Sequence, residues 1–552
     1  MAARYGTWQH GLGFAAGWLA LTLAGSGFAA AAGAQSAPAE AQSAPASAQD
    51  AQAQSVVSVS IDPAKMARLG VVDERFQSYN IEMVEVIGGR FWKPYGSKAP
   101  ADTKADSGVG LDPSLYEQRS PVNLSDPRLR KLAKALGPAY VRVSGSWANT
   151  VYFQDSDAPA LAKPPEGFGG VLTRAEWKGV VDFAKSVDAR IVTSFATSMG
   201  TRDAAGRWTP VEAKKFIDYT HSIGGSIAGA EFMNEPTFTI AAGVPKDYNA
   251  TNYGQDFAVF EPFFRKAAPE ALLLGPGSVG EGIEFVPMKI LPTKDMLEAM
   301  GPIKVDGFSY HFYGAVSERC SRPEMGVKGT SPDAALTEEW LGRTVKVEEF
   351  YAALRDTYDS GKPMWLTETG QAACGGDRWA STFLDSFRYL DQLGRLAKKQ
   401  VQVVIHNTLD ASDYGLIDEK TMTPRPNYWA ALMWHQTMGT TVLDAGASPS
   451  ESLALYAQCM KNHPGGVTLL ALNLNGTKTQ KFNVPGDALS YTLTSPDLMS
   501  HEVELNDMPM ALLANGDVPS PKGLPTAKGE LRLPAASITF FTFAGANNPA
   551  CK

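Results

Sequence analysis

Two glutamates lie where an apolar, strand-like segment gives way to a loop. Glu235 stands in "GAEFMNEPTF" (229–238), ahead of a proline that cannot extend a sheet. Glu368 ends the apolar part of "PMWLTETG" (363–370). Taken singly, each glutamate is explained equally well as a polar strand end or a helix cap. As a pair, two carboxylates can hydrolyse a glycosidic bond, because one protonates the departing oxygen while the other attacks the anomeric carbon or activates water.

The elements that must position this pair follow a regular alternation between residues 78 and 438. Short β-rich segments alternate there with amphipathic helical segments, which predicts a parallel sheet, and eight such repeats predict an α/β fold of the (β/α)₈ TIM-barrel type. The strand candidates are 78–84, 139–145, 190–197, 227–235, 271–277, 305–313, 363–368 and 401–407. The main helix candidates are 126–137, 174–187, 211–223, 338–358 and 383–399.

In such a barrel Glu235 ends the fourth strand and Glu368 ends the seventh. The carboxyl ends of the strands are where barrel enzymes place their catalytic residues. The sequence therefore predicts that both side chains face one cleft.

The remainder of the chain has a different pattern. Residues 439–552 contain short alternating segments with turn signals and no long helical pattern, which predicts a C-terminal antiparallel β-sandwich. Residues 56–77 begin with similar alternation, "SVVSVSID" (55–62). We expect this segment to add an N-terminal strand to the sandwich.

The N-terminal 34 residues have the form of an export signal. Arg4 precedes the apolar segment 11–34, which ends in the small-x-small sequence Ala-Gly-Ala typical of a cleavage site. The alternative is an uncleaved membrane anchor, since the segment is long enough to span a bilayer. Residues 35–55 then form a low-complexity linker that repeats "QSAPA". We expect a secreted or periplasmic protein without stable membrane insertion after cleavage.

Charge and motif content exclude several classes of protein. The net charge is −8 and no Lys/Arg block stands out, so no nucleic-acid partner is expected. The seven histidines are scattered without an HExxH motif. No P-loop and no G-x-S-x-G sequence is found. We therefore expect no metal and no other cofactor, and we expect a monomer.

Other strand ends carry polar side chains that suit a sugar site. His311 and Tyr313 end the sixth strand in "SYHFYG", with the period-two spacing that turns both to the same face. A hydroxyl there can bind the nucleophile, although a packed barrel residue is the alternative. Asn234 can hydrogen-bond the sugar 2-hydroxyl. Ser146 and Trp147 follow the second strand in "SGSW", where the indole either stacks on a sugar or fills the core.

Many separated motifs in one order resemble glycoside hydrolase family 79, the family of heparanases and β-glucuronidases. They include "NEPTF", "WLTETGQAACGG", "GPAYVRVSGS", "DASDYGLIDEKTMTPRPNYW" and "LPAASITFFTF" with the terminal "ACK". The resemblance runs from about residue 55 to the C-terminus. It implies a retaining hydrolase in which Glu235 is the proton donor and Glu368 the nucleophile.

The resemblance also implies how the substrate is recognised. It assigns the backbone amides of Gly375 and Gly376 and the hydroxyl of Tyr414 to the glucuronate carboxylate. The expected function is thus a retaining glycoside hydrolase that cleaves β-linked glucuronic acid from a glucuronate-containing oligo- or polysaccharide. The alternatives are a barrel glycosidase for neutral β-glycosides and a glycan-binding protein without turnover.

The four cysteines are expected to form two disulfides. The family resemblance pairs Cys459 with Cys551 in the sandwich. Cys320 and Cys374 follow the sixth and seventh strands, which are neighbours around a barrel, so a second bridge between those loops is geometrically reasonable. Two free thiols are the alternative for that second pair.

Two loop regions bear on the substrate. A long segment after the first strand, 93–121, indicates a cleft walled at one end, and hence exo action. The segment 275–289 carries two acidic residues and a single lysine, whereas animal heparanases flank the cleft with basic clusters. This composition argues against heparan sulfate as the substrate.

Overall fold

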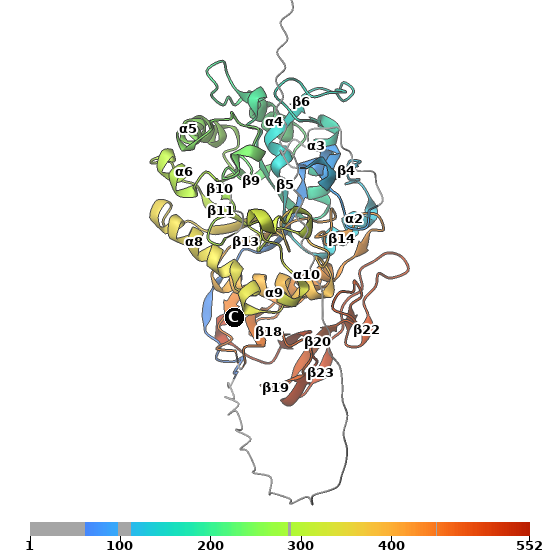
Figure 1. Ribbon diagram of the computed structural model, residues 1–552. Coiled ribbons are helices and arrows are strands. Elements are labelled where there is room, and N and C mark those ends of the chain that lie inside the picture. The colour runs from blue at the N-terminus through green and yellow to red at the C-terminus, as the bar shows by residue number, and fades with distance from the viewer. Residues whose placement is uncertain (1–60, 98–111, 285–288, 449) are drawn as a thin grey trace, which may run out of the picture. The chain divides into compact units, whose positions relative to one another are not determined.

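Eight parallel strands close into a barrel in the computed structural model, which describes residues 61–97, 112–284, 289–448 and 450–552 (Figure 1). Neighbouring strands pair in chain order and the eighth pairs with the first, which confirms the TIM-barrel prediction. The strands are β2 (Gln77–Glu82), β5 (Ala139–Ser144), β8 (Ala189–Ser194), β9 (Ile227–Glu231), β10 (Leu272–Ser278), β11 (Gly307–Phe312), β12 (Met364–Thr369) and β13 (Val403–His406).

Side chains fill the lower part of this barrel. Tyr140 on β5 and Trp365 on β12 have ring centroids 4.8 Å apart, although these strands are not neighbours. Because side chains alternate along a strand, Arg142 lies on the same inward face as Tyr140, one layer nearer the carboxyl ends. The packed apolar layer therefore forms a floor beneath the polar residues.

Helices surround the barrel, as the amphipathic segments predict. The long helix expected over 338–358 is divided at Gly342 into two. The helices are α1 (Met83–Ile87), α2 (Pro127–Ala135), α3 (Arg174–Ser186), α4 (Val211–Ser222), α5 (Ala250–Ala267), α6 (Thr293–Met300), α7 (Glu338–Leu341), α8 (Arg343–Tyr358), α9 (Phe383–Lys398) and α10 (Pro426–Thr437). None of the described helices is long and apolar enough to cross a bilayer.

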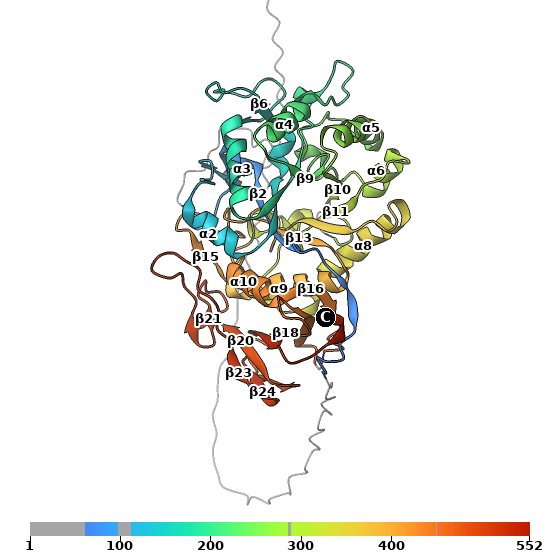
Figure 2. The ribbon, with the colours of Figure 1, turned by 180° about the vertical axis from the view of Figure 1, so that it is seen from behind.

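An antiparallel sheet packs against α9 and α10 beside the barrel (Figures 1 and 2). Its strands are β1 (Arg68–Val71), β16 (Met438–Leu443), β17 (Leu453–Met460), β18 (Val467–Asn473), β25 (Ser537–Phe543), β20 (Ala488–Thr494), β21 (Glu504–Leu505), β22 (Met508–Pro509) and β23 (Leu524–Thr526). Within the predicted segment 56–77, the strand Arg68–Val71 pairs with β16 at the edge of this sheet, whereas the prediction was based on the alternation over 55–62. Of that predicted segment, residues 55–60 lie outside the described residues, as do the predicted signal and linker.

The sheet buries both of its faces, which makes it one layer of a sandwich. Along β18, Leu470 and Leu472 belong to the core shared with the barrel, whereas Leu469 and Ala471 face a second core. That second core is covered by the pair β19 (Gln480–Val484) and β24 (Gly529–Leu533). A disulfide between Cys459 and Cys551 ties the C-terminal 3₁₀ turn to β17.

Three smaller strand pairs lie in the connections. The β3 (Gly89–Trp92) and β4 (Tyr116–Arg119) pair follows α1 and flanks the part of segment 93–121 that lies within the described residues, 93–97 and 112–121. The others are β6 (Val151–Gln154) with β7 (Gly170–Thr173), and β14 (Ile417–Asp418) with β15 (Thr423–Pro424).

Candidate active site

Glu235 lies in a loop beyond the fourth strand. The predicted strand 227–235 ends at Glu231, and Glu235 has a left-handed backbone with φ of 47°. Such a conformation is costly for a residue with a side chain and is common at functional sites. The Asn149 side chain holds the loop, since its Oδ1 accepts from the Asn234 amide at 2.8 Å and its Nδ2 donates to the Asn234 carbonyl at 2.9 Å.

Glu368 enters the site through an irregularity in the seventh strand. The pairing register of β12 shifts against both neighbouring strands at this point. As a result, the consecutive side chains of Thr367 and Glu368 both reach the polar cluster, where Thr367 Oγ1 donates to Glu231 Oε1 at 2.7 Å. A bulge that re-aims a side chain next to an active site is a recurrent device in β-structure.

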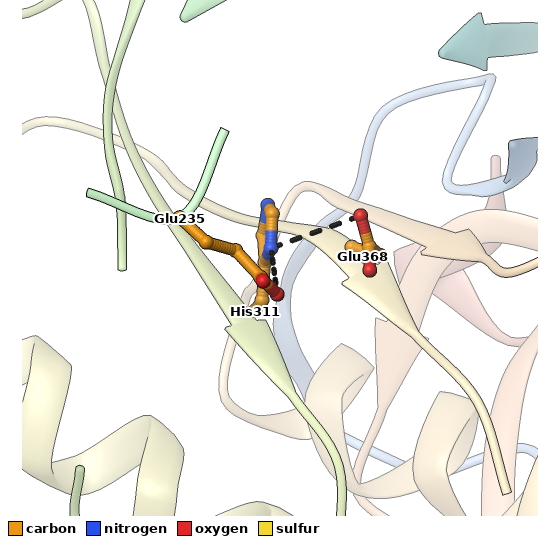
Figure 3. Close-up of side chains that lie close together, drawn as sticks. All are labelled: Glu235, His311 and Glu368. Atoms are coloured by element: carbon orange, nitrogen blue, oxygen red, sulfur yellow. Dashed lines mark hydrogen bonds and ion pairs between the residues drawn. The ribbon is translucent and has the colours of Figure 1, made fainter. Parts of the chain in front are cut away.

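The two glutamates meet at His311 (Figure 3). His311 Nδ1 is 3.1 Å from Glu235 Oε1 and 3.8 Å from Glu368 Oε2. A carboxylate oxygen of Glu235 lies within 4.8 Å of a carboxylate oxygen of Glu368. Retaining glycosidases hold their carboxyl groups about 5 Å apart, whereas inverting enzymes need at least about 6.5 Å to admit a water. The spacing therefore fits direct attack on the sugar by a carboxylate.

The environments of the two carboxyl groups differ. Glu368 is held by two donors, Arg142 Nη1 at 2.9 Å and the Tyr313 hydroxyl at 2.8 Å, which fix its orientation. Glu235 has no such guanidinium contact among the described ion pairs. Burial raises the pKa of Glu235, the negative charge of Glu368 acts in the same direction, and the hydrogen bond with His311 opposes them. A raised pKa suits a group that must donate a proton.

His311 lies between the two glutamates and against the arginine beneath them, with Arg142 Nη2 3.2 Å from His311 Nε2. Burial by itself would lower the pKa of His311, but the neighbouring carboxylates, Glu368 foremost, raise it to about 9. The imidazole is fully buried and occupies the space between the two predicted catalytic residues. It can therefore compensate the negative charges that the glutamates bring into a dry site.

A buried ion network lies beneath the two glutamates, above the apolar floor of the barrel. The sequence analysis missed this network. Arg142 Nη2 is 2.8 Å from both Glu231 Oε2 and Asn234 Oδ1, and neither charged side chain is exposed to solvent. Burial would lower the pKa of Arg142, but Glu231 and Glu368 raise it above its usual range. Burial likewise would raise the pKa of Glu231, but Arg142 holds it well below the usual value. The sequence signal that could have identified this network is Arg142 inside the apolar strand "AYVRVS".

Replacing Arg142 by methionine is expected to lower the free energy of unfolding by about 3–5 kcal/mol, because Glu231 and Glu368 would remain as buried, uncompensated charges. Denaturant-induced unfolding measures the change. The matched control, Arg128→Met on the exposed side of α2, should change stability little. A variant as stable as the wild type would show that the network contributes specificity rather than stability.

A further buried glutamate, Glu82, was also missed and lies behind the nucleophile. Asn407 Nδ2 lies 2.9 Å from Glu82 Oε1, 3.0 Å from the Tyr313 hydroxyl and 3.1 Å from the Tyr414 hydroxyl. Burial, and then the charge of Glu368, raise the pKa of Glu82 well above its usual value. Glu82 ends the first strand, and Glu368 lies one residue before the end of the seventh. This shared position is the sequence signal that could have identified Glu82.

Glycine opens the space that Glu82 needs. Gly145 has φ of 88°, and a Cβ there would lie 1.4 Å from Glu82 Oε2. The chain then turns into a 3₁₀ helix that begins with Ser146, which is half-buried. Ser146 is thus next to the residue that contacts Glu82, at the edge of the polar cluster.

The predicted carboxylate-binding residues lie together on the loops after the seventh and eighth strands. Gly375 and Gly376 are both left-handed, with φ of 83° and 82°, and Gly376 packs against Tyr414. The Gly376 amide donates to the Ala372 carbonyl at 3.2 Å, so the loop already engages it. A disulfide joins Cys374 to Cys320, as the barrel order suggested, and anchors the glycine pair.

The spacing of Glu235, His311 and Glu368 would also accept a metal ion. Cationic partners already occupy this position, however, because Arg142 binds Glu368 and the pKa of His311 is raised to about 9. The donor set therefore fits proton transfer better than metal binding.

Comparisons with known proteins find glycoside hydrolases and their relatives. The model described as "Glycosyl hydrolase family 79, N-terminal domain" matches residues 116–394. Heparanase-like protein 1 of Arabidopsis thaliana is 30% identical, over 64% of this chain and 65% of that protein, just under two thirds of its length. Hyaluronoglucuronidase of Hirudo nipponia is 27% identical, over 81% of this chain and 95% of that protein. Heparanase of Mus musculus is 27% identical, over 83% and 93% respectively.

Solved structures share the fold at low identity. A 4-O-α-L-rhamnosyl-β-D-glucuronidase from Fusarium oxysporum superposes with a TM-score of 0.57 at 14% identity, over 88% of this chain and 99% of that chain. An arabinofuranosidase superposes with the same TM-score at 13% identity, over the same shares of both chains. The barrel with its sandwich is therefore an architecture found in several glycosidases.

Proposed function

The chain belongs to glycosyl hydrolase family 79, and from that premise we propose that it is a retaining β-glucuronidase acting on glucuronate-containing glycans. The observation that carries the proposal is the pair of Glu235 and Glu368, with oxygens within 4.8 Å and unlike surroundings. The predicted signal segment 1–34 supports export as the setting of this activity.

The geometry supports a double displacement. Glu368 attacks the anomeric carbon while Glu235 protonates the glycosidic oxygen, so that the bond to the leaving group breaks and a glycosyl ester forms. Glu235, now ionised, then removes a proton from water, which attacks the same carbon and frees Glu368. Tyr313 and Arg142 hold the nucleophile in position through these steps.

Neutral donors near Tyr414 support a glucuronate in this site. The Tyr414 hydroxyl lies 3.1 Å from Asn407 Nδ2, which also contacts the Tyr313 hydroxyl that binds Glu368, and Gly376 packs against Tyr414. Hydrogen bonds to a carboxylate are strong in a dry site. The relatives named for heparanase and hyaluronoglucuronidase support the same substrate class.

A highly sulfated glycan is not favoured. In the segment after the fifth strand, Glu284 is exposed and pairs with Lys328 at 3.1 Å, whereas Glu281 is held by Thr293 and Tyr351. A polyanion would meet an acidic group and a neutralised lysine there. We therefore propose an unsulfated or weakly sulfated glycan.

Paired chromogenic substrates test the proposal. The wild type should cleave an aryl β-glucuronide far faster than the matching aryl β-glucoside. Tyr414→Phe should lower kcat/KM for the glucuronide by about 10–100-fold, as expected for losing a hydrogen bond to a charged group, with little effect on the glucoside. Tyr219→Phe, on the outer helix α4, is the control.

Two outcomes would contradict the proposed β-glucuronidase function. A preference for the glucoside would favour a neutral-sugar hydrolase. Binding of glucuronate oligosaccharides without turnover of either substrate would favour a glycan-binding protein.

A further inference from the structure

We propose that an aromatic wall closes the glycone end of the cleft, so that the enzyme removes single glucuronic acid units from the non-reducing end. The wall consists of Phe91, Trp92, Tyr116 and Trp147. This inference rests on the proposed glucuronidase function and adds its mode of action.

The wall is a packed cluster rather than a set of loose side chains. Trp92 stacks on Tyr116 with ring centroids 4.7 Å apart. Trp147 meets Phe91 edge-on at 5.2 Å, Trp92 at 6.4 Å and Tyr116 at 6.3 Å. Phe91 and Tyr116 are buried, whereas the two tryptophans keep part of their surface exposed. The buried rings therefore support two indoles that can contact a ligand.

The wall is built mainly on strand connections other than that of the proton donor. Phe91 and Trp92 follow the first strand and pack with Ala411, which follows the eighth, whereas Glu235 follows the fourth. Hydrogen bonds also link Glu368 through Tyr313 and Asn407 to Glu82. Glu82 lies against Gly145, two residues before Trp147.

The loop that follows the nucleophile's strand also packs against the wall. The loop after β12 carries Gly375, and a Cβ at Gly375 would lie 2.6 Å from Trp92 Cβ. Since the leaving group must lie beside Glu235, the opposite edge of the bound sugar faces the wall.

Arg319 fastens the wall to the catalytic loops. Its guanidinium donates to the Lys93 carbonyl at 2.6 Å and pairs with Asp413 on the loop after the eighth strand. Its Cζ also lies 4.1 Å from the ring centroid of Tyr95, and Arg378 lies 4.4 Å from the same ring.

This fastening is buried and reinforced covalently. The Arg319 side chain is only 7% exposed. Its neighbour Cys320 forms the disulfide to Cys374. Since three loops and a disulfide converge here, the wall is a fixed part of the site.

The chemical consequence is a limit on substrate length at one end. Each turnover adds one water across the terminal glycosidic bond, releases one glucuronic acid and shortens the chain by one sugar. A glucuronate that carries a further sugar on O3 or O4 would place that sugar against the wall.

Two probes with the same leaving group test this inference. One is an aryl β-glucuronide, and the other is the same compound carrying a hexose on O4. The wild type should show kcat/KM at least about 100-fold lower for the substituted probe, because the wall excludes the extra ring. Equal cleavage within about tenfold would overturn the inference. Failure to cleave the plain probe would instead overturn the proposed function, so the two failures are distinguishable.

A wall variant adds an independent readout. In Trp92→Ala the ratio of kcat/KM between the two probes should shrink by about tenfold or more, because the indole no longer blocks the second sugar. Phe350→Ala, a partly exposed aromatic on α8, is the matched control and should leave the ratio unchanged. A ratio that stays unchanged in a folded Trp92→Ala protein, as judged by circular dichroism, would remove the wall from the explanation.

Discussion

Replacing Glu368 by alanine should abolish turnover of every β-glucuronide, with a loss of about four orders of magnitude or more. The covalent intermediate forms on this side chain, so no choice of leaving group can compensate for its absence. Steady-state kinetics with aryl glucuronides of differing leaving-group pKa measures the effect. Added azide should attack from the vacated face and yield the α-glucuronyl azide.

The design includes two controls for Glu368. Glu368→Gln keeps the shape of the side chain and should be equally inactive, which separates a chemical loss from a packing loss. Glu270→Ala removes an exposed carboxylate that pairs with His221 on the outside of the barrel and should retain activity. An active Glu368→Ala protein, or an inverted product anomer from the wild type by NMR, would contradict the retaining mechanism.

Replacing Glu235 by alanine should have an effect that depends on the leaving group. Turnover of a natural glycan should fall by about 10²–10⁴-fold, because the departing oxygen no longer receives a proton. An activated aryl glucuronide should still complete its first turnover as a burst, since its phenolate leaves unaided. Azide should restore turnover and give the β-glucuronyl azide, in contrast to Glu368→Ala.

The pH profile offers a further readout for Glu235. A proton donor must be protonated, so activity falls as pH rises through its pKa, and burial moves the pKa of Glu235 upward. The wild-type alkaline limb should therefore lie above the ordinary range of a glutamate, and Glu235→Ala should lose that limb on an activated substrate. If the azide anomers of the two variants were exchanged, the assigned roles would be reversed.

Much of the framework was accessible from sequence because it depends on local periodicity. Apolar segments separated by amphipathic helices predicted the barrel, and each of the eight predicted strands overlaps an observed one. Barrel order then placed Cys320 and Cys374 on adjacent loops, and the structure contains that disulfide. The fourth strand was drawn too long, because propensity does not register that the chain turns at Glu231 into a left-handed loop residue at Glu235.

The buried polar residues behind the pair were not accessible in this way. Arg142 and Glu231 lie inside apolar strands, where a charge is costly unless a partner is present. Arg142 and Glu231 are separated by 89 residues in the chain, and Arg142 and Glu368 by 226. Only closure of the barrel brings these strands face to face.

The sequence by itself determined the order of strands and helices, the placement of Glu235 after the fourth strand and of Glu368 near the end of the seventh, and the resemblance that implied their roles. The tertiary structure decided which other side chains complete the site and where the cleft ends. Trp92, Trp147 and Arg319 come from three different loops, and Arg319 reaches Lys93 across 226 residues. Local patterns arise from neighbours along the chain, whereas a wall or an ion network forms only when distant loops pack together, and no periodicity records that packing.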